Sequence, residues 1–161
     1  MQALRPDRLM SAMTTFFRRA EVQQALHLGK PGRSQFNYAT SGPASIVLYP
    51  ELVKKIRVLI YNGDADSCVP YVGNEEWTTG LAAAGTVKEK KAWHPWYASD
   101  AKNVPAGYAT SYTVPGADSG INGGNGYFTF ITIRLAGHMV PNFRPDAALT
   151  FITNFFSHTD F

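Results

Sequence analysis

The centre of the chain contains an apolar run, Ile56-Arg57-Val58-Leu59-Ile60-Tyr61, followed directly by the turn Asn62-Gly63-Asp64-Ala65-Asp66. The run is short and rich in β-branched residues, so it predicts a strand over residues 56–61, buried on both faces of a parallel sheet. In α/β sheets, functional side chains lie just beyond the carboxyl ends of such strands. The acidic turn therefore stands where catalytic residues are expected.

The sequence on either side of this strand predicts a mixed fold with many turns. Apolar residues at helical spacing predict two short helices within residues 7–28, a helix over 44–55 around Pro50, and an amphipathic helix over 74–84. Strand patterns at 104–114 and 127–135 flank a turn rich in glycine and asparagine, which predicts a hairpin, and Pro145 opens a final helix. Residues 32–43 are expected to be a surface connection, and no helix or strand is assigned to residues 86–103. We therefore expect one α/β domain in these 161 residues.

Charge and composition exclude several classes of partner. The net charge of +3 arises from 15 basic and 12 acidic residues that are scattered along the chain, so no patch for nucleic acid or a membrane surface is indicated. No apolar segment approaches the length of a membrane span. The first twenty residues show no signal-peptide pattern. Cys68 is the single cysteine, so no disulfide can form within the chain.

A second motif, Ala136-Gly137-His138-Met139-Val140-Pro141, follows the last predicted strand and precedes the last helix. Histidine is the usual general base for a serine hydroxyl, and a carboxylate can orient its ring. A lone histidine is more often structural, and Asn-Gly-Asp turns usually only end strands. The order strand, Asp, strand, His is nevertheless the order that an α/β-hydrolase uses after its nucleophilic serine.

Residues 58–66, 73–77 and 136–141 resemble the C-terminal half of a serine carboxypeptidase. The resemblance implies that residues 1–161 are a single partial domain, the C-terminal portion of an α/β-hydrolase fold, which acts without metal or cofactor. It implies that Asp66, rather than Asp64, is the triad carboxylate and that His138 is the base. It also places Cys68 and Met139 at the substrate pockets. The implied substrates are the C-termini of peptides and proteins, and the implied location is lysosomal, vacuolar or secreted.

The nucleophile itself is not expected in this chain. No Gly-x-Ser-x-Gly elbow is present, since neither Ser34 nor Ser119 has glycines at the required positions. We therefore expect the serine on a missing N-terminal segment or separate chain, and no activity from residues 1–161 alone. Without that partner, the strand at 56–61 would expose its edge and favour self-association.

Two alternatives remain open at this point. One is a catalytically inactive binding or scaffold protein with the hydrolase topology, in which Trp93, Trp96 and Tyr97 line a groove. Packing of these aromatic residues under a long loop is the simpler interpretation. The other is a metal site at His94 and His138, which the spacing of the ligands does not favour.

Overall fold

The computed structural model describes residues 6–27, 42–98 and 103–161, and the chain divides into two compact units, residues 1–42 and 43–161. In the first unit, α1 (Pro6–Phe17) and α2 (Ala20–Ala25) confirm the two short helices predicted there. Arg19 precedes α2 and forms an ion pair with Glu21 in its first turn. Of the connection expected at 32–43, residues 32–41 lie outside the described residues.

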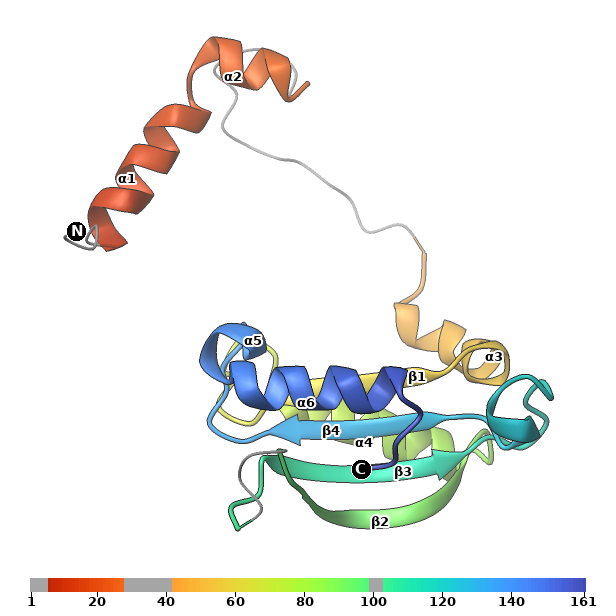
Figure 1. Ribbon diagram of the computed structural model, residues 1–161. Helices are drawn as coiled ribbons and strands as arrows, with labels where there is room; N and C mark the ends of the chain where they lie inside the picture. The colour runs from red at the N-terminus through yellow and green to blue at the C-terminus, as the bar shows by residue number, and fades with distance from the viewer. Residues whose placement is uncertain (1–5, 28–41, 99–102) are drawn as a thin grey trace. The chain divides into compact units, whose positions relative to one another are not determined.

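The second unit is built on a four-stranded mixed sheet. Its strands are β1 (Val58–Gly63), β2 (Lys88–Trp96), β3 (Gly107–Thr113) and β4 (Phe128–Ile133), in the order β1-β4-β3-β2. β1 and β4 are parallel and β3 is antiparallel to both neighbours, which confirms the predicted parallel strand and hairpin. Because Gly63 pairs with Ile133, the carboxyl ends of β1 and β4 reach the same edge of the sheet (Figure 1).

The helices predicted over 44–55, 74–84 and from Pro145 are present, and two short helices, η2 and α5, were not predicted. The helices of the second unit are η1 (Ser45–Leu48), α3 (Tyr49–Lys55), α4 (Tyr71–Ala83), η2 (Asn122–Gly124), α5 (Val140–Phe143) and α6 (Pro145–Phe156). Pro50 and Pro145 both stand in a first helical turn, where a missing N–H costs nothing. No described helix is both long enough and apolar enough to cross a bilayer.

The strand β2 occupies a segment to which the sequence assigned no element, and it places Trp93 and Trp96 on a strand instead of under a long loop. Four consecutive charged residues at 88–91 and Pro95 make this segment look like a solvated connection. It is an edge strand, where charged side chains and proline are tolerated and prevent further pairing. Trp93 and Trp96 therefore lie on a strand. Trp96 is buried, with its indole N–H 2.9 Å from the carbonyl of Thr132, so it cannot line the open groove of the binding alternative.

Two apolar clusters hold the sheet, one on each face. The cluster on the α6 side includes Ala109, Ile131, Ile133, Ala147 and Phe151, and the cluster on the α4 side includes Val53, Leu81, Tyr112 and Phe128. Alternate residues of β3 and β4 supply the two faces, as the pleat of a strand requires. β1 departs from the prediction of burial on both faces, because it is at the other edge of the described sheet and Tyr61 remains 46% exposed.

Candidate active site

The loops that follow β1 and β4 are bound to each other by their backbones. The amide of Asp64 donates to the carbonyl of Ile133, and the amide of Ala65 donates to the carbonyl of Ala136, both at 3.0 Å. Gly63 lets the loops approach this closely, because a Cβ at that position would lie 2.2 Å from the Ala136 carbonyl oxygen. The parallel pairing of β1 and β4 thus continues into the loops that carry the two predicted catalytic residues.

Asp66 and His138, separated by 72 positions, meet at this edge of the sheet. The Asp66 Oδ2 atom lies 2.9 Å from His138 Nδ1. The other carboxylate oxygen accepts the backbone N–H groups of Cys68 and Val69, at 2.8 and 3.1 Å. The side chain is only 4% exposed, so its position is well defined by these contacts. The geometric juxtaposition expected from the sequence is present.

Hydrogen bonding favours the ionised form of Asp66. The contact with His138 lowers the pKa of the Asp66 carboxyl, and the amides of Val69 and Cys68 lower it further, while burial opposes them. An ionised carboxylate can only accept hydrogen bonds, so the proton of a neutral His138 ring belongs on Nδ1. That tautomer leaves the lone pair of Nε2 available to accept a proton.

His138 presents this second nitrogen to solvent. Its side chain is 60% exposed, and no described residue forms a hydrogen bond with Nε2. Gly137 lies against the ring of Phe143, where a Cβ would sit 3.1 Å from the nearest ring carbon. The His138 ring is therefore oriented by Asp66 at Nδ1 and has no protein partner at Nε2 among the described residues.

A buried amide network supports the Asp66 loop, and the sequence did not predict it. The Asn62 side chain donates to the Val69 carbonyl at 3.0 Å and accepts from the Asn74 amide of α4. Trp77 in turn donates its indole N–H to Asn74, at 2.6 Å. The sequence predicts that Asn62-Gly63 begins a turn, whereas Asn62 lies inside β1 and is 7% exposed. The sequence did contain one signal for this network, because the polar residue Asn62 directly continues the apolar run of β1.

The two predicted substrate-pocket residues flank the site. Cys68, next but one to Asp66, is an exposed free cysteine, and Met139, next to His138, is 56% exposed. Both side chains are accessible at the same edge of the sheet as the Asp66 and His138 pair. Their contact with substrate stays a prediction.

Other candidate groups lie elsewhere or are engaged. Ser119 is in the β3–β4 loop, at the opposite end of β4 from His138, and Ser34 lies outside the described residues. His94 is on β2, with its ring nitrogens 2.6 and 3.0 Å from the carbonyls of Ala92 and Phe161. Within residues 6–27, 42–98 and 103–161, no three His, Cys, Asp or Glu side chains gather to hold a metal.

The four-stranded mixed sheet with its flanking helices is consistent with a partial α/β-hydrolase fold. The chain belongs to the serine carboxypeptidase family, whose model matches residues 4–158. Putative serine carboxypeptidase-like 30 of Arabidopsis thaliana is 32% identical over 152 residues, 87% of this chain and 27% of that relative. Serine carboxypeptidase 1 of Hordeum vulgare is 37% identical over 95 residues, 59% of this chain and 15% of that relative.

A third similar protein is also named as a carboxypeptidase. Carboxypeptidase Y homolog A of Leptosphaeria maculans is 35% identical over 105 residues, covering 65% of this chain and 17% of its own length. Among the relatives compared, the chain spans from 15% to 29% of their length. The matched region thus corresponds to a minor part of each relative.

Proposed function

We propose that this chain supplies the acid and the base of a serine-type carboxypeptidase, which releases amino acids from the C-termini of peptides and proteins. Membership of the family supports the reaction class. The observation that carries the residue assignment is the 2.9 Å contact between Asp66 and His138 beside the carboxyl ends of two parallel strands. That is the geometry in which a carboxylate orients a catalytic imidazole.

In the proposed mechanism, His138 Nε2 takes the proton of a serine hydroxyl as its oxygen attacks the last peptide carbonyl. Asp66 stabilises the imidazolium that forms. The imidazolium then returns the proton to the leaving amine, and the C-terminal amino acid departs while the serine retains the acyl group. His138 next deprotonates a water that attacks this ester, and the serine is regenerated when the proton is returned.

The nucleophile is proposed to come from a partner segment or chain that covers β1. In the described sheet the outer edge of β1 has no neighbouring strand, so its backbone groups are free to pair. α6 carries an exposed apolar stripe, Leu149, Ile152 and Phe156, with exposures of 68, 40 and 71%. A partner that extends the sheet beyond β1 and packs on this stripe would bury both surfaces.

The remaining proposals follow from family membership. Cys68 and Met139 are proposed to contact the residue before the scissile bond and the departing residue, respectively, because they are exposed beside the Asp66 and His138 pair. A secreted, vacuolar or lysosomal location is proposed on the same ground. Residues 1–161 alone are proposed to be inactive, since a base without its nucleophile retains little of the rate enhancement.

A reconstitution experiment tests the assignment. Residues 1–161 are co-expressed with a serine-bearing N-terminal segment of a serine carboxypeptidase, and the complex is treated with a fluorophosphonate probe that labels activated serines. Release of the C-terminal residue from an N-blocked dipeptide is measured in parallel. We expect labelling and release from the complex and neither from the isolated chain.

Matched variants assign the roles of the two residues. His138→Ala and Asp66→Asn should each reduce kcat by roughly a thousandfold or more, while assembly of the complex is unchanged. Asp64→Asn, two residues away on the same loop, retains an acceptor oxygen and should stay within a few-fold of the unmodified complex. Labelling or peptide release by the isolated chain, or full activity of the His138→Ala complex, would contradict the proposal.

A further inference from the structure

The amide network that supports the Asp66 loop forms a single directed series of hydrogen bonds. The indole N–H of Trp77 donates to Asn74 Oδ1 at 2.6 Å, and the Asn74 amide nitrogen donates to Asn62 Oδ1. Asn62 donates through its own nitrogen to the Val69 carbonyl at 3.0 Å. The backbone N–H of Val69 then donates to Asp66 Oδ1 at 3.1 Å. Side chains of α4 are thus connected to the Asp66 carboxylate.

The direction of this series is fixed by its two ends. An indole nitrogen can only donate a hydrogen bond and a backbone carbonyl can only accept one, so each asparagine amide has one orientation that satisfies both of its contacts. A rotated Asn62 amide would place its oxygen against the Val69 carbonyl and its nitrogen against the Asn74 nitrogen. Because Asn62 is only 7% exposed, water could not readily replace the lost bonds. The Asn62 side chain is therefore held in one conformation.

The bend at residues 67–69 belongs to no helix or strand, and the Val69 side chain is 46% exposed, so Asn62 supplies a support that no regular element gives. Asp66 Oδ1 accepts the backbone amides of Cys68 and Val69. The other oxygen, Oδ2, lies 2.9 Å from His138 Nδ1. A carboxylate is rigid and planar, so two amides that restrain Oδ1 also restrict the direction in which Oδ2 points. The same amides contribute to the lowered pKa of the Asp66 carboxyl.

We propose that Asn62 is a positioning residue for His138. With the two α4 side chains of the network, it holds the Val69 backbone in place, and Val69 holds the Asp66 carboxylate that orients the ring. A carboxylate at Nδ1 selects the neutral tautomer whose proton is on that nitrogen. Without Asn62, the bend should move, the contact with the carboxylate should weaken, and the ring should populate both tautomers. The importance of this for catalysis rests on the proposed function, whereas the positioning itself is a property of the chain alone.

Nitrogen NMR of the histidine rings tests the positioning in the full 161-residue chain. At about pH 8.5 an ordinary histidine ring is neutral, and its 15N shifts report which nitrogen carries the proton. We expect His138 of the unmodified chain to be protonated on Nδ1. Asn62→Ala and Asn74→Ala should each move much of the proton to Nε2. Trp77→Phe, which removes only the indole N–H at the far end, should do so to a smaller extent. If Asn62→Ala does not fold, the two α4 variants carry the test.

The titration of Asp66 provides a second readout. Its carboxyl carbon is followed by 13C NMR as the pH is lowered. Because loss of an amide hydrogen bond raises the pKa of a carboxyl, Asp66 should take up its proton at a higher pH in Asn62→Ala than in the unmodified chain. A role of Asn62 in general stability alone would lower the free energy of unfolding without moving this titration.

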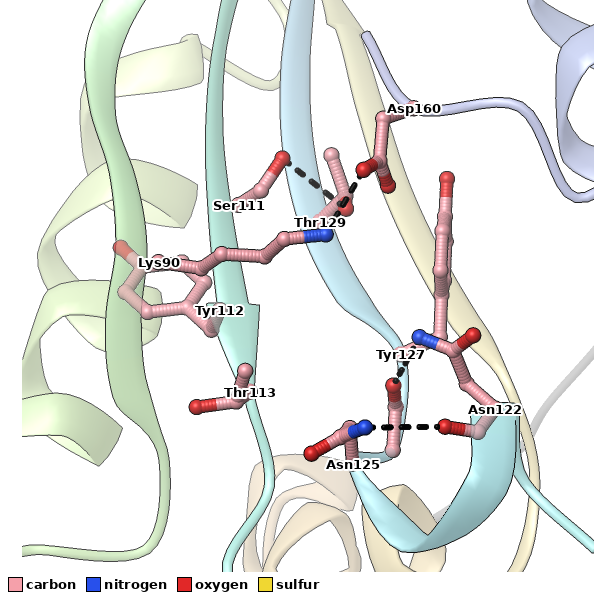
Figure 2. Close-up of a pocket in the computed structure, with 10 residues that line it drawn as sticks. Lys90, Ser111, Tyr112, Thr113, Asn122, Asn125, Tyr127, Thr129 and Asp160 are labelled. Carbon is pink, nitrogen blue, oxygen red and sulfur yellow. Dashed lines mark hydrogen bonds and ion pairs between the residues drawn. The ribbon is translucent and has the colours of Figure 1, made fainter.

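Asn122→Ala is the matched control. The Asn122 side chain also donates to a backbone carbonyl, that of Gly126 at 3.2 Å, but it does so in the loop between β3 and β4 (Figure 2). Its φ of 50° means that alanine there strains the backbone and destabilises the chain too. Because Asn122 precedes β4 and His138 follows the other end of that strand, both NMR readouts should be unchanged. The control thus separates loss of stability from loss of positioning.

Kinetics connect the positioning to the proposed activity. In the reconstituted complex, Asn62→Ala should lower kcat by about tenfold to a hundredfold and leave KM nearly unchanged, because the base is displaced rather than removed. Asn122→Ala should stay within a few-fold of the unmodified complex. A tautomer change in the isolated Asn62→Ala chain, combined with an unmodified complex that has no peptidase activity, would support the positioning and refute the proposed function.

Three results would overturn the positioning role. One is a His138 ring that remains protonated on Nδ1 in the folded variants of the network. Another is a mixture of tautomers already in the unmodified chain, since Asn62 would then have no orientation to maintain. The third is an equal change in the Asn122→Ala chain, or an active complex in which Asn62→Ala retains full kcat.

Discussion

The Asp64 carboxylate accepts a hydrogen bond of 2.7 Å from the backbone amide of Leu135. This bond crosses from the loop after β1 to the loop after β4, beside the pair formed by Asp66 and His138. Leu135 has a positive φ of 59°, which a branched side chain rarely adopts, so its backbone needs support from its surroundings. Asp64, which the resemblance does not assign to the triad, therefore also fixes the histidine loop.

Removing this bond should loosen the histidine loop without unfolding the protein. We expect Asp64→Ala to lower the free energy of unfolding by about 1–2 kcal/mol and to accelerate hydrogen exchange at the Leu135 amide. Asp64→Asn keeps an acceptor oxygen and should protect that amide nearly as well as the unmodified chain does. Equal exchange rates in the alanine variant and the unmodified chain would show that the bond contributes nothing.

A methyl group at Gly63 should separate the two loops. Gly63→Ala would place Cβ 2.2 Å from the Ala136 carbonyl oxygen, which belongs to rigid backbone, and we expect a loss of about 1–3 kcal/mol in urea unfolding. Gly73→Ala is the matched control on α4, where no atom lies within 4 Å of the added Cβ. Because alanine favours the helix, this control should gain about 0.5–1 kcal/mol. A tolerated Gly63→Ala would refute the close approach.

Asp66 should contribute to the loss of stability in acid. Its pKa in the folded chain is below the unfolded value, so the unfolded chain takes up the proton first as the pH falls. The stabilisation is complete above the unfolded pKa of about 4 and is lost as the pH falls through the lower, folded value. Asp66→Asn should remove this component and flatten the decline in unfolding free energy below pH 4, measured by urea titrations at successive pH values.

Asp118→Asn controls for the loss of one negative charge, since Asp118 is an exposed residue that pairs with Lys55. We expect its acid profile to remain parallel to that of the unmodified chain. An Asp66→Asn profile that is also parallel would contradict the role of the ionised carboxylate in stability.

Arg57 should stabilise the second unit through its two aromatic neighbours. Its guanidinium carbon lies 4.5 Å from the ring centres of both Tyr127 and Phe155, and one of its nitrogens donates to the Phe155 carbonyl. Arg57→Lys keeps the charge but replaces a planar group with a point charge, and should cost about 1–3 kcal/mol in thermal or urea unfolding. Lys55→Ala, which breaks an exposed ion pair with Asp118, should cost less than about 1 kcal/mol.

The exposed stripe of α6 should govern self-association of the isolated chain. We expect sedimentation to show concentration-dependent association that the double variant Leu149→Glu and Phe156→Glu reduces, because both side chains are large, apolar and exposed. Val104→Glu is a control, since Val104 is 51% exposed but lies just before β3 rather than on α6. A monodisperse unmodified chain would contradict the expectation.

The local sequence determined the element types and the positions of the candidate residues. Three local signals were enough to predict the helices, the parallel strand and the pair of candidate residues. They are the apolar run ending at Tyr61, the prolines at positions 50 and 145, and the two motifs that contain Asp66 and His138. These signals are local, because strand burial, first-turn proline and turn chemistry each depend on a few neighbouring residues. The strand β2 was not predicted, because an edge strand often carries charged side chains in place of the alternation of apolar and polar residues that marks a half-buried strand.

Tertiary structure alone decided the contacts that make a site. Asp66 meets His138 because β1 and β4 pair in parallel in one register, and a shift of that register would separate them. The hydrogen bond between Asp64 and Leu135 and the bonds of the Asn62 side chain to Val69 and Asn74 also join residues whose neighbours in the sequence give no sign of them. Such contacts depend on the distances between segments remote in the chain, and only packing of the sheet sets those distances.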